Sequence, residues 1–286
     1  MLWYQDALLF VAALLAGGMN SVAGGGTLLT FPTLLWAGGA AGWVNAALVA
    51  NATSTVALWP GALSSFWGYR GQLPSDRRET ILLAIPSTLG GAIGATILTL
   101  TSESVFKSLV PYLILLATLL FVAQAPLAKL RSRWAERNRG ARGLSEAEID
   151  EALDRADTPG LRGARRRWLA VLAFQFLVGV YGGYFGAGIG ILMLAGFSWL
   201  GFTNIHHMNA LKNLIGAGIN GITAVILISN GFVHWPVALL MSVAAILGGY
   251  AGAGIAQRIG QKWVRRIVIA IGFSLTAYML LHQFRG

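Results

Sequence analysis

Residues 178–190 read V-G-V-Y-G-G-Y-F-G-A-G-I-G, and residues 16–27 carry a fainter copy, A-G-G-M-N-S-V-A-G-G-G-T. Each stretch lies within a long apolar run, where lipid offers the backbone no hydrogen-bond partner. Irregular, glycine-rich backbone is stable at that depth only where it is buried in protein or lines a cavity. Two such breaks at corresponding places in two halves of a chain are typical of a transporter's binding site.

The composition around these stretches indicates an all-α polytopic membrane protein. Of 286 residues, 56% are hydrophobic and 11% are charged. A soluble helical protein of this length would need more charge to cover its surface. Apolar runs of about 20 residues, long enough to cross a bilayer, recur along the chain. We expect eight apolar segments, at residues 7–35, 44–67, 80–100, 105–128, 169–200, 206–229, 235–256 and 264–284.

A charged linker separates these segments into two groups of four. Residues 129–167 hold eleven of the 21 basic residues and seven of the eleven acidic ones. This placement is typical of a cytoplasmic loop near anionic headgroups, so the net charge of +10 does not call for a nucleic-acid partner. We therefore expect a membrane repeat at 1–128, a cytoplasmic linker at 129–167 and a second membrane repeat at 168–286. Ser145 and Glu148 have capping-box spacing, which predicts a short linker helix.

The two groups of segments are related in sequence. Residues 162 positions apart match in three places, which are Gly24 with Gly186, Gly26 with Gly188, and Asn51 with Asn213. The pattern G-G-x-x-G-A also recurs at a separation of 158 positions, at 90–95 and 248–253. Shared spacing over several segments indicates an internal duplication. The G-x-x-x-G spacing in the second pattern is itself typical of close helix packing.

Loop charge predicts that the two repeats have opposite orientations. Between the second and third segments the first half carries Arg70, Arg77 and Arg78, whereas the equivalent loop at 230–234 has no Lys or Arg. Because cytoplasmic loops are enriched in Lys and Arg, the equivalent loops would face opposite sides. The first segment of each repeat would then be a re-entrant hairpin with a glycine-rich tip. The alternative is eight plain spans in parallel repeats, with one loop that departs from the charge rule.

The most polar cluster inside an apolar segment is H-H-M-N-A-L-K-N at residues 206–213. Asn209, Asn213 and Asn220 share one face of a helix at this spacing. Lys212 is the one charge deep within any apolar segment, and no acidic residue accompanies it there. A lysine in a membrane segment usually marks a functional site, and an amine without a carboxylate favours an anion. In the alternative interpretation, Lys212 reaches the interface or packs against backbone carbonyls.

Other features bear on the chemistry of this site. Helix starts at the glycine tips would present unpaired N–H groups, which form an anion site without any side chain. His206 and His207 are candidates for proton coupling, with a passive interfacial position as the alternative. The sequence contains no cysteine, phosphate-binding loop, catalytic triad or metal-ligand spacing. We therefore expect no enzymatic activity, no metal and no cofactor.

The motif G-V-Y-G-G-Y-F-G-A-G-I-G-I-L-M-L at 179–194, with 206–213 and A-G-G-G-T-L-L-T-F-P at 23–32, closely resembles the TauE/SafE family of membrane permeases, or sulfite exporters. The resemblance covers nearly the whole membrane part. It implies a multi-pass protein of the bacterial inner membrane that exports or exchanges small sulfur oxyanions or organosulfonates, such as sulfite or sulfoacetate. An anion channel and a membrane scaffold remain alternatives, and a homodimer is left open.

Carried over by motif position, the resemblance and the polar cluster together predict one translocation site. Its expected residues are Gly24, Gly25, Gly26, Asn51, Gly186, Gly188, Gly190, Asn209, Lys212 and Asn213.

Overall fold

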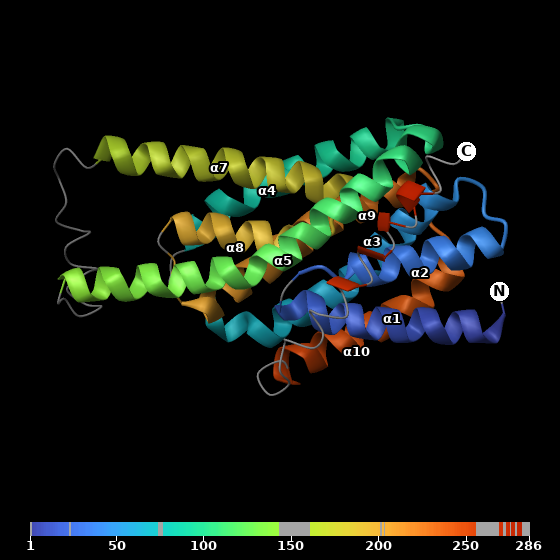
Figure 1. Cartoon of the computed structure of the whole chain (residues 1–286), viewed down its shortest axis with the longest axis horizontal. Coiled ribbons are helices and arrows are strands. Elements are labelled where there is room, and N and C mark those ends of the chain that lie inside the picture. Colours follow the sequence, from blue (N-terminus) through green and yellow to red (C-terminus); the bar gives the residue numbers. More distant parts are fainter. Residues whose placement is uncertain are drawn as a thin grey trace.

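The computed structural model is a helical bundle in which two helical segments are interrupted near the middle (Figure 1). It describes residues 2–22, 24–73, 77–142, 161–200, 202, 204–255, 269–270, 273–274, 276–277 and 279–281. The helices in this part are α1 (Trp3–Val22), α2 (Thr27–Ala40), α3 (Ala46–Tyr69), η1 (Arg70–Gln72), α4 (Arg77–Leu100), α5 (Glu103–Arg142), α7 (Leu161–Tyr184), α8 (Ile189–Trp199), α9 (Ile205–Ser229) and α10 (Trp235–Ile255).

Several of these helices are long and apolar enough to cross a membrane. Within the described residues there are five, which are Ala46–Gln72, Arg78–Leu100, Glu103–Ala123, Ile205–Ser229 and Trp235–Gly252. They confirm the predicted all-α, polytopic membrane fold. The apolar parts of the second broken segment, Trp168–Tyr184 and Ile189–Trp199, are shorter. The expected linker helix after residue 143 and much of the segment at 264–284 lie outside the described residues.

Each glycine-rich stretch separates two helices that pack against each other. The first break lies between α1 and α2, and the second lies between α7 and α8. Gly24 and Gly186 have φ angles of 69° and 81°, a left-handed conformation that glycine adopts at no steric cost. In Figure 1 the α1–α2 pair reaches the middle from the right-hand end, and the α7–α8 pair from the left-hand end. An inverted repeat would produce these directions, and the inverted orientation itself stays a prediction.

Close glycine contacts hold each broken segment against the other half of the chain. α1 packs most extensively against α10, and α4 packs most extensively against α7. A Cβ added at Gly248 would meet the carbonyl oxygen of Leu14, and one added at Gly90 would meet that of Phe176. The two G-x-x-x-G motifs therefore allow the backbones to approach closely, as in many membrane helix pairs.

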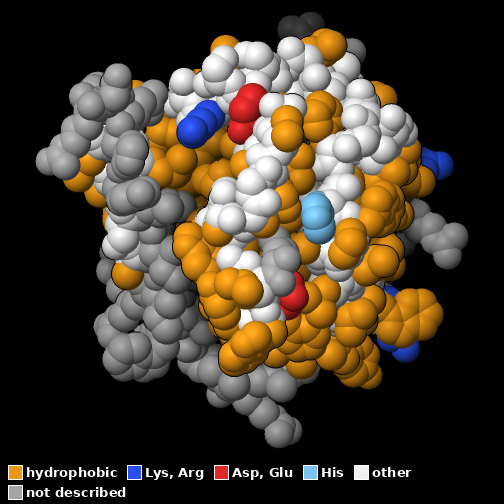
Figure 2. Space-filling model, turned by 90° about the vertical axis from the view of Figure 1, so that its right-hand side faces the viewer, with side chains coloured by type: hydrophobic (Ala, Val, Ile, Leu, Met, Phe, Trp, Pro, Cys, Tyr) orange, Lys and Arg blue, Asp and Glu red, His pale blue; other side chains and the backbone are white. Residues whose placement is uncertain are grey.

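The outer surface of the bundle is apolar. Leu89 on α4 and Leu239 and Tyr250 on α10 have exposed fractions of 57%, 61% and 66%. Figure 2 views the end that lies on the right in Figure 1 and shows hydrophobic side chains over much of its rim, with few charged ones. Exposed apolar side chains of this kind suit contact with lipid. The chain is therefore a multi-pass integral membrane protein.

The two glycine tips touch each other in the middle of the bundle. A Cβ added at Gly24 would lie 2.7 Å from the Cα and 3.0 Å from the backbone nitrogen of Gly190. Contact between the tips thus requires glycine at position 24 both for its φ angle and for space.

We predict that Gly24→Ala lowers the free energy of unfolding by about 1–3 kcal/mol, because the new Cβ is strained at this φ angle and meets Gly190. The measurement is the thermal unfolding midpoint of the detergent-purified protein. Gly42→Ala isolates the strain, because Gly42 has a φ angle of 70° and nothing lies within 4 Å of its Cβ position. Gly39→Ala is a control with free space in a helix. Equal losses in the Gly24 and Gly42 variants would contradict a stabilising tip contact.

Candidate functional site

A pocket lies where the two glycine tips meet the middle of α3 and α9. Its walls come from both halves of the chain and from residues far apart in sequence. The lining residues are Asn20, Gly24, Gly25, Thr27, Thr55, Leu58, Ala62, Gly186, Ile189, Gly190, Met193, Lys212, Asn213, Gly216 and Asn220.

The structure places many of the predicted site residues in this pocket. Those that line it are Gly24, Gly25, Gly186, Gly190, Lys212 and Asn213. Four other predicted residues, Gly26, Asn51, Gly188 and Asn209, do not belong to the lining. Asn20, Thr27 and Thr55 were not among the predicted site residues, and Asn220 was predicted only to share a helix face with Asn209 and Asn213.

Two side chains of α9 bind the end of α1. Lys212 Nζ donates to the carbonyl oxygens of Asn20 and Ser21, each at 3.3 Å, and Asn213 Nδ2 donates to that of Ser21 at 3.2 Å. Carbonyls in the last turn of a helix lack intrahelical partners, and a positive charge suits the partial negative charge there. An ammonium has more N–H donors than these two bonds use. Lys212 therefore binds backbone carbonyls and also lines the pocket.

The end of α7 is bound in a similar way by the first half of the chain. Asn51 Nδ2 donates to the carbonyl oxygen of Tyr184, the last residue of α7, at 3.1 Å. Asn51 and Asn213 are 162 positions apart, so matching amides bind the ends of the two interrupted helices. The lysine has no such match, because the residue 162 positions before Lys212 is Ala50. The pocket therefore receives its charge from one half only.

The backbone just before α2 is bound from within its own hairpin. Asn20 Oδ1 accepts hydrogen bonds from the backbone N–H groups of Gly25 at 2.8 Å and Gly26 at 2.7 Å. The expectation that both helix starts present unpaired N–H groups is therefore wrong for these two glycines. The physical reason is that a polar side chain in the last turn of α1 reaches across the break to the next helix.

The start of α8 has no such cap. Its N-cap residue, Gly188, has a φ angle of 80°, and no side chain caps this end. The residue 162 positions after Asn20 is Gly182, which has no side chain to play the same role. The first N–H groups of a helix have no intrahelical partner, and the pocket lining includes Ile189 and Gly190 from this turn. The second tip thus brings a helix start with a positive dipole end to the pocket.

The chemistry of the lining favours a small negatively charged ligand. It holds one lysine, three asparagines, two threonines and several glycines, and it includes no aspartate or glutamate. One wall is apolar, with Leu58, Ala62 and Met193. In the part of the chain that the structure describes, no three His, Cys, Asp or Glu residues are grouped to hold a metal ion.

The two histidines lie in the first turn of α9, away from the pocket lining. Asn204 Oδ1 accepts from the backbone N–H groups of His206 and His207 at 2.9 and 3.4 Å, so this turn has an ordinary N-cap. The imidazole of His206 is exposed. Their role in proton coupling stays a prediction.

Known proteins resemble this chain over nearly its full length. A probable membrane transporter protein of Haemophilus influenzae is 27% identical, over 97% of this chain and 95% of its own. The probable membrane transporter protein ORF9 of Sinorhizobium sp is 26% identical, over 96% of this chain and 92% of its own. The probable membrane transporter protein YfcA of Escherichia coli K12 is 26% identical, over 96% of this chain and 88% of its own. No solved structure matches the chain.

The family match covers the same range. Residues 9–279 match the family described as sulfite exporter TauE/SafE, which confirms the resemblance found from the glycine and His-Asn-Lys motifs. The names of the family and of the relatives are those of membrane transporters rather than of enzymes. With its apolar helices and central pocket, the chain is a membrane transporter that belongs to the TauE/SafE family.

Proposed function

We propose that the chain is a secondary permease that exports or exchanges small sulfur-containing anions, such as sulfite or an organosulfonate, across the inner membrane. The observation that carries the proposal is the pocket at the glycine tips, with Lys212 and three amides and without a carboxylate in its lining. A cation at this place would lack a counter-charge, whereas an anion finds one.

Each part of the pocket has a role in this proposal. Lys212 supplies the charge, and the one N–H donor beyond its two carbonyl bonds contacts the anion. The N–H groups at the start of α8 bind anionic oxygen atoms, as helix starts do in other anion sites. Asn20, Asn213 and Asn220 line the same space and orient the ligand. The wall with Leu58 and Met193 leaves room for a short carbon chain on the anion.

The arrangement of the hairpins supports a transport cycle. The α1–α2 and α7–α8 pairs approach the pocket from opposite ends of the bundle in Figure 1. Halves of opposite orientation around a central site are typical of secondary transporters, in which one half rocks against the other. We propose that Lys212 and the second glycine tip hold the anion while access changes from one side of the membrane to the other.

We predict that Lys212→Gln weakens sulfite binding about 10- to 100-fold, because hydrogen bonds to charged groups contribute about 1.5–3 kcal/mol. The measurement is isothermal titration calorimetry on the detergent-purified protein. Lys107→Gln is the matched control, because it removes one lysine from an exposed position in the first turns of α5. The unfolding midpoints of both variants are measured as well, since Lys212 also binds the end of α1. Unchanged affinity in a folded Lys212 variant would remove this residue from the site.

We predict that sulfite flux into proteoliposomes saturates and is accelerated by unlabelled sulfite inside, because a carrier returns faster when it is loaded. The measurement is uptake of radiolabelled sulfite, with protein-free liposomes as the blank. Flux that rises linearly with concentration and ignores internal sulfite would indicate an anion channel. Absence of both flux and binding would leave a scaffold as the better description.

A further inference from the structure

Matching positions of the two predicted repeats contribute unequally to the pocket lining. We call two residues counterparts when they lie 162 positions apart, the offset that relates Gly24 to Gly186 and the first residue of α2 to that of α8. Several lining residues are partly exposed while their counterparts are buried. These pairs are Asn20 with Gly182, Thr55 with Ala217, and Gly216 with Ser54. We call the side of the pocket that holds the buried members of these pairs the closed side, and the side that holds the partly exposed members the open side.

The closed side contains buried polar side chains, one of which has an unpartnered oxygen atom. Asn51 is 1% exposed and its Oδ1 has no hydrogen-bond partner. Ser54 and Thr30 are both 0% exposed, and their hydroxyl oxygens lie 2.6 Å apart in a hydrogen bond that joins α3 to α2. A buried polar atom without a partner is destabilising, and such atoms in native structures call for a physical explanation. Such an explanation is that the oxygen of Asn51 meets water in a second conformation of the protein.

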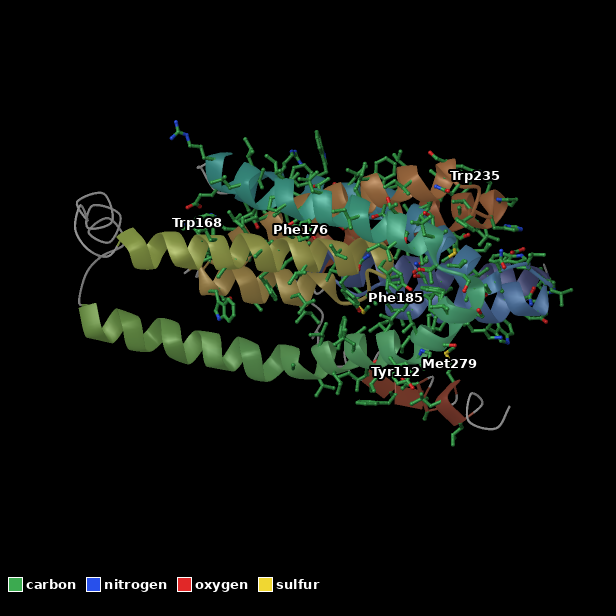
Figure 3. The ribbon with its side chains drawn as sticks, turned by 90° about the horizontal axis from the view of Figure 1, so that it is seen from above. Tyr112, Trp168, Phe176, Phe185, Trp235 and Met279 are labelled. Carbon is green, nitrogen blue, oxygen red and sulfur yellow. The ribbon has the colours of Figure 1, made fainter. Side chains whose placement is uncertain are left out.

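Phe31, which follows Thr30 in sequence, packs against two other aromatic rings. The ring centroids of Phe31 and Phe185 lie 5.3 Å apart, and those of Phe31 and Phe106 lie 6.5 Å apart, both edge to face. In Figure 3 Phe185 lies deep in the bundle, between Trp168 toward one end and Trp235 toward the other. The counterpart of Phe31 is Met193, a flexible side chain that lines the open pocket.

We propose that Asn51 and Ser54 line a second mouth of the pocket, closed here by the ring of Phe31, through which the ligand leaves on the opposite side of the membrane. This inference rests on the transport step of the proposed function. When the halves exchange conformations, Ser54 takes the exposed position that Gly216 has now, and the open side closes. The unpartnered oxygen of Asn51 then meets water or the ligand.

Single thiols test this proposal directly, because the chain has no cysteine. Ser54→Cys and Gly216→Cys are a counterpart pair, and nothing lies within 4 Å of the Cβ position of Gly216. Ala57→Cys is the buried control, because Ala57 is 0% exposed and does not line the pocket. Each variant is treated with a membrane-impermeant methanethiosulfonate reagent, in right-side-out vesicles and in everted vesicles.

We expect the Gly216→Cys thiol to react from one side, the Ser54→Cys thiol from the other side, and the Ala57→Cys thiol from neither. A Ser54→Cys thiol that is unreactive from both sides, or that reacts from the same side as Gly216→Cys, would overturn the second mouth. The labelling needs no sulfur anion. If sulfite fails to bind while the thiols react from opposite sides, the proposed ligand is wrong and the second mouth stands. If sulfite is transported while Ser54→Cys stays unreactive, this inference alone fails.

A second variant tests the seal. Phe31→Met gives the closed side the residue that stands at the counterpart position on the open side. We expect it to raise the labelling rate of Ser54→Cys about tenfold, since it removes two edge-to-face ring contacts that stabilise the closed side. The reaction of Gly216→Cys in the same background reports whether the fold is intact. A labelling rate unchanged by Phe31→Met would contradict the role of this ring as the gate.

Discussion

The structure depends on how the ends of two interrupted helices find partners inside a membrane. Lipid provides no hydrogen bonds, so each free carbonyl or N–H group at the breaks needs a partner from the protein or from a water-filled cavity. Asn213 and Lys212 bind the last carbonyls of α1, and Asn51 binds the last carbonyl of α7. These contacts join each hairpin to a helix of the other half. Two of these side chains, Lys212 and Asn213, also line the pocket.

A few sequence differences between the two halves give the pocket its positive charge. The amides at positions 51 and 213 match, but Lys212 corresponds to Ala50. Asn20 binds the N–H groups of Gly25 and Gly26 just before α2, whereas the corresponding Gly182 has no side chain to do the same before α8. Charge and an uncapped helix start thus come together on one side of the tips. Both features come from the second half of the chain, and together they suit an anion.

The sequence predicts the helix breaks better than it predicts which residues line the pocket. Gly24 and Gly186 were identifiable because lipid tolerates glycine-rich breaks only in protected places, and Lys212 because a charge there is costly. Asn20 was missed, because its bonds to Gly25 and Gly26 arise only once the chain turns back at the break. Gly188 and Asn209 carry the motif but stand outside the lining, since motif spacing does not determine which way a residue faces.

Two energy terms on the closed side of the pocket are of similar size and opposite sign, which suits the proposed two-state transport. A buried oxygen without a partner, such as Asn51 Oδ1, costs about 1–3 kcal/mol in the observed state. The two ring contacts of Phe31 stabilise that state by about 0.5–1.5 kcal/mol each. In the proposed cycle these two terms offset each other when the closed side opens. An anion that binds one state better by a few kcal/mol is then enough to shift the population, because differential affinity alone moves such an equilibrium.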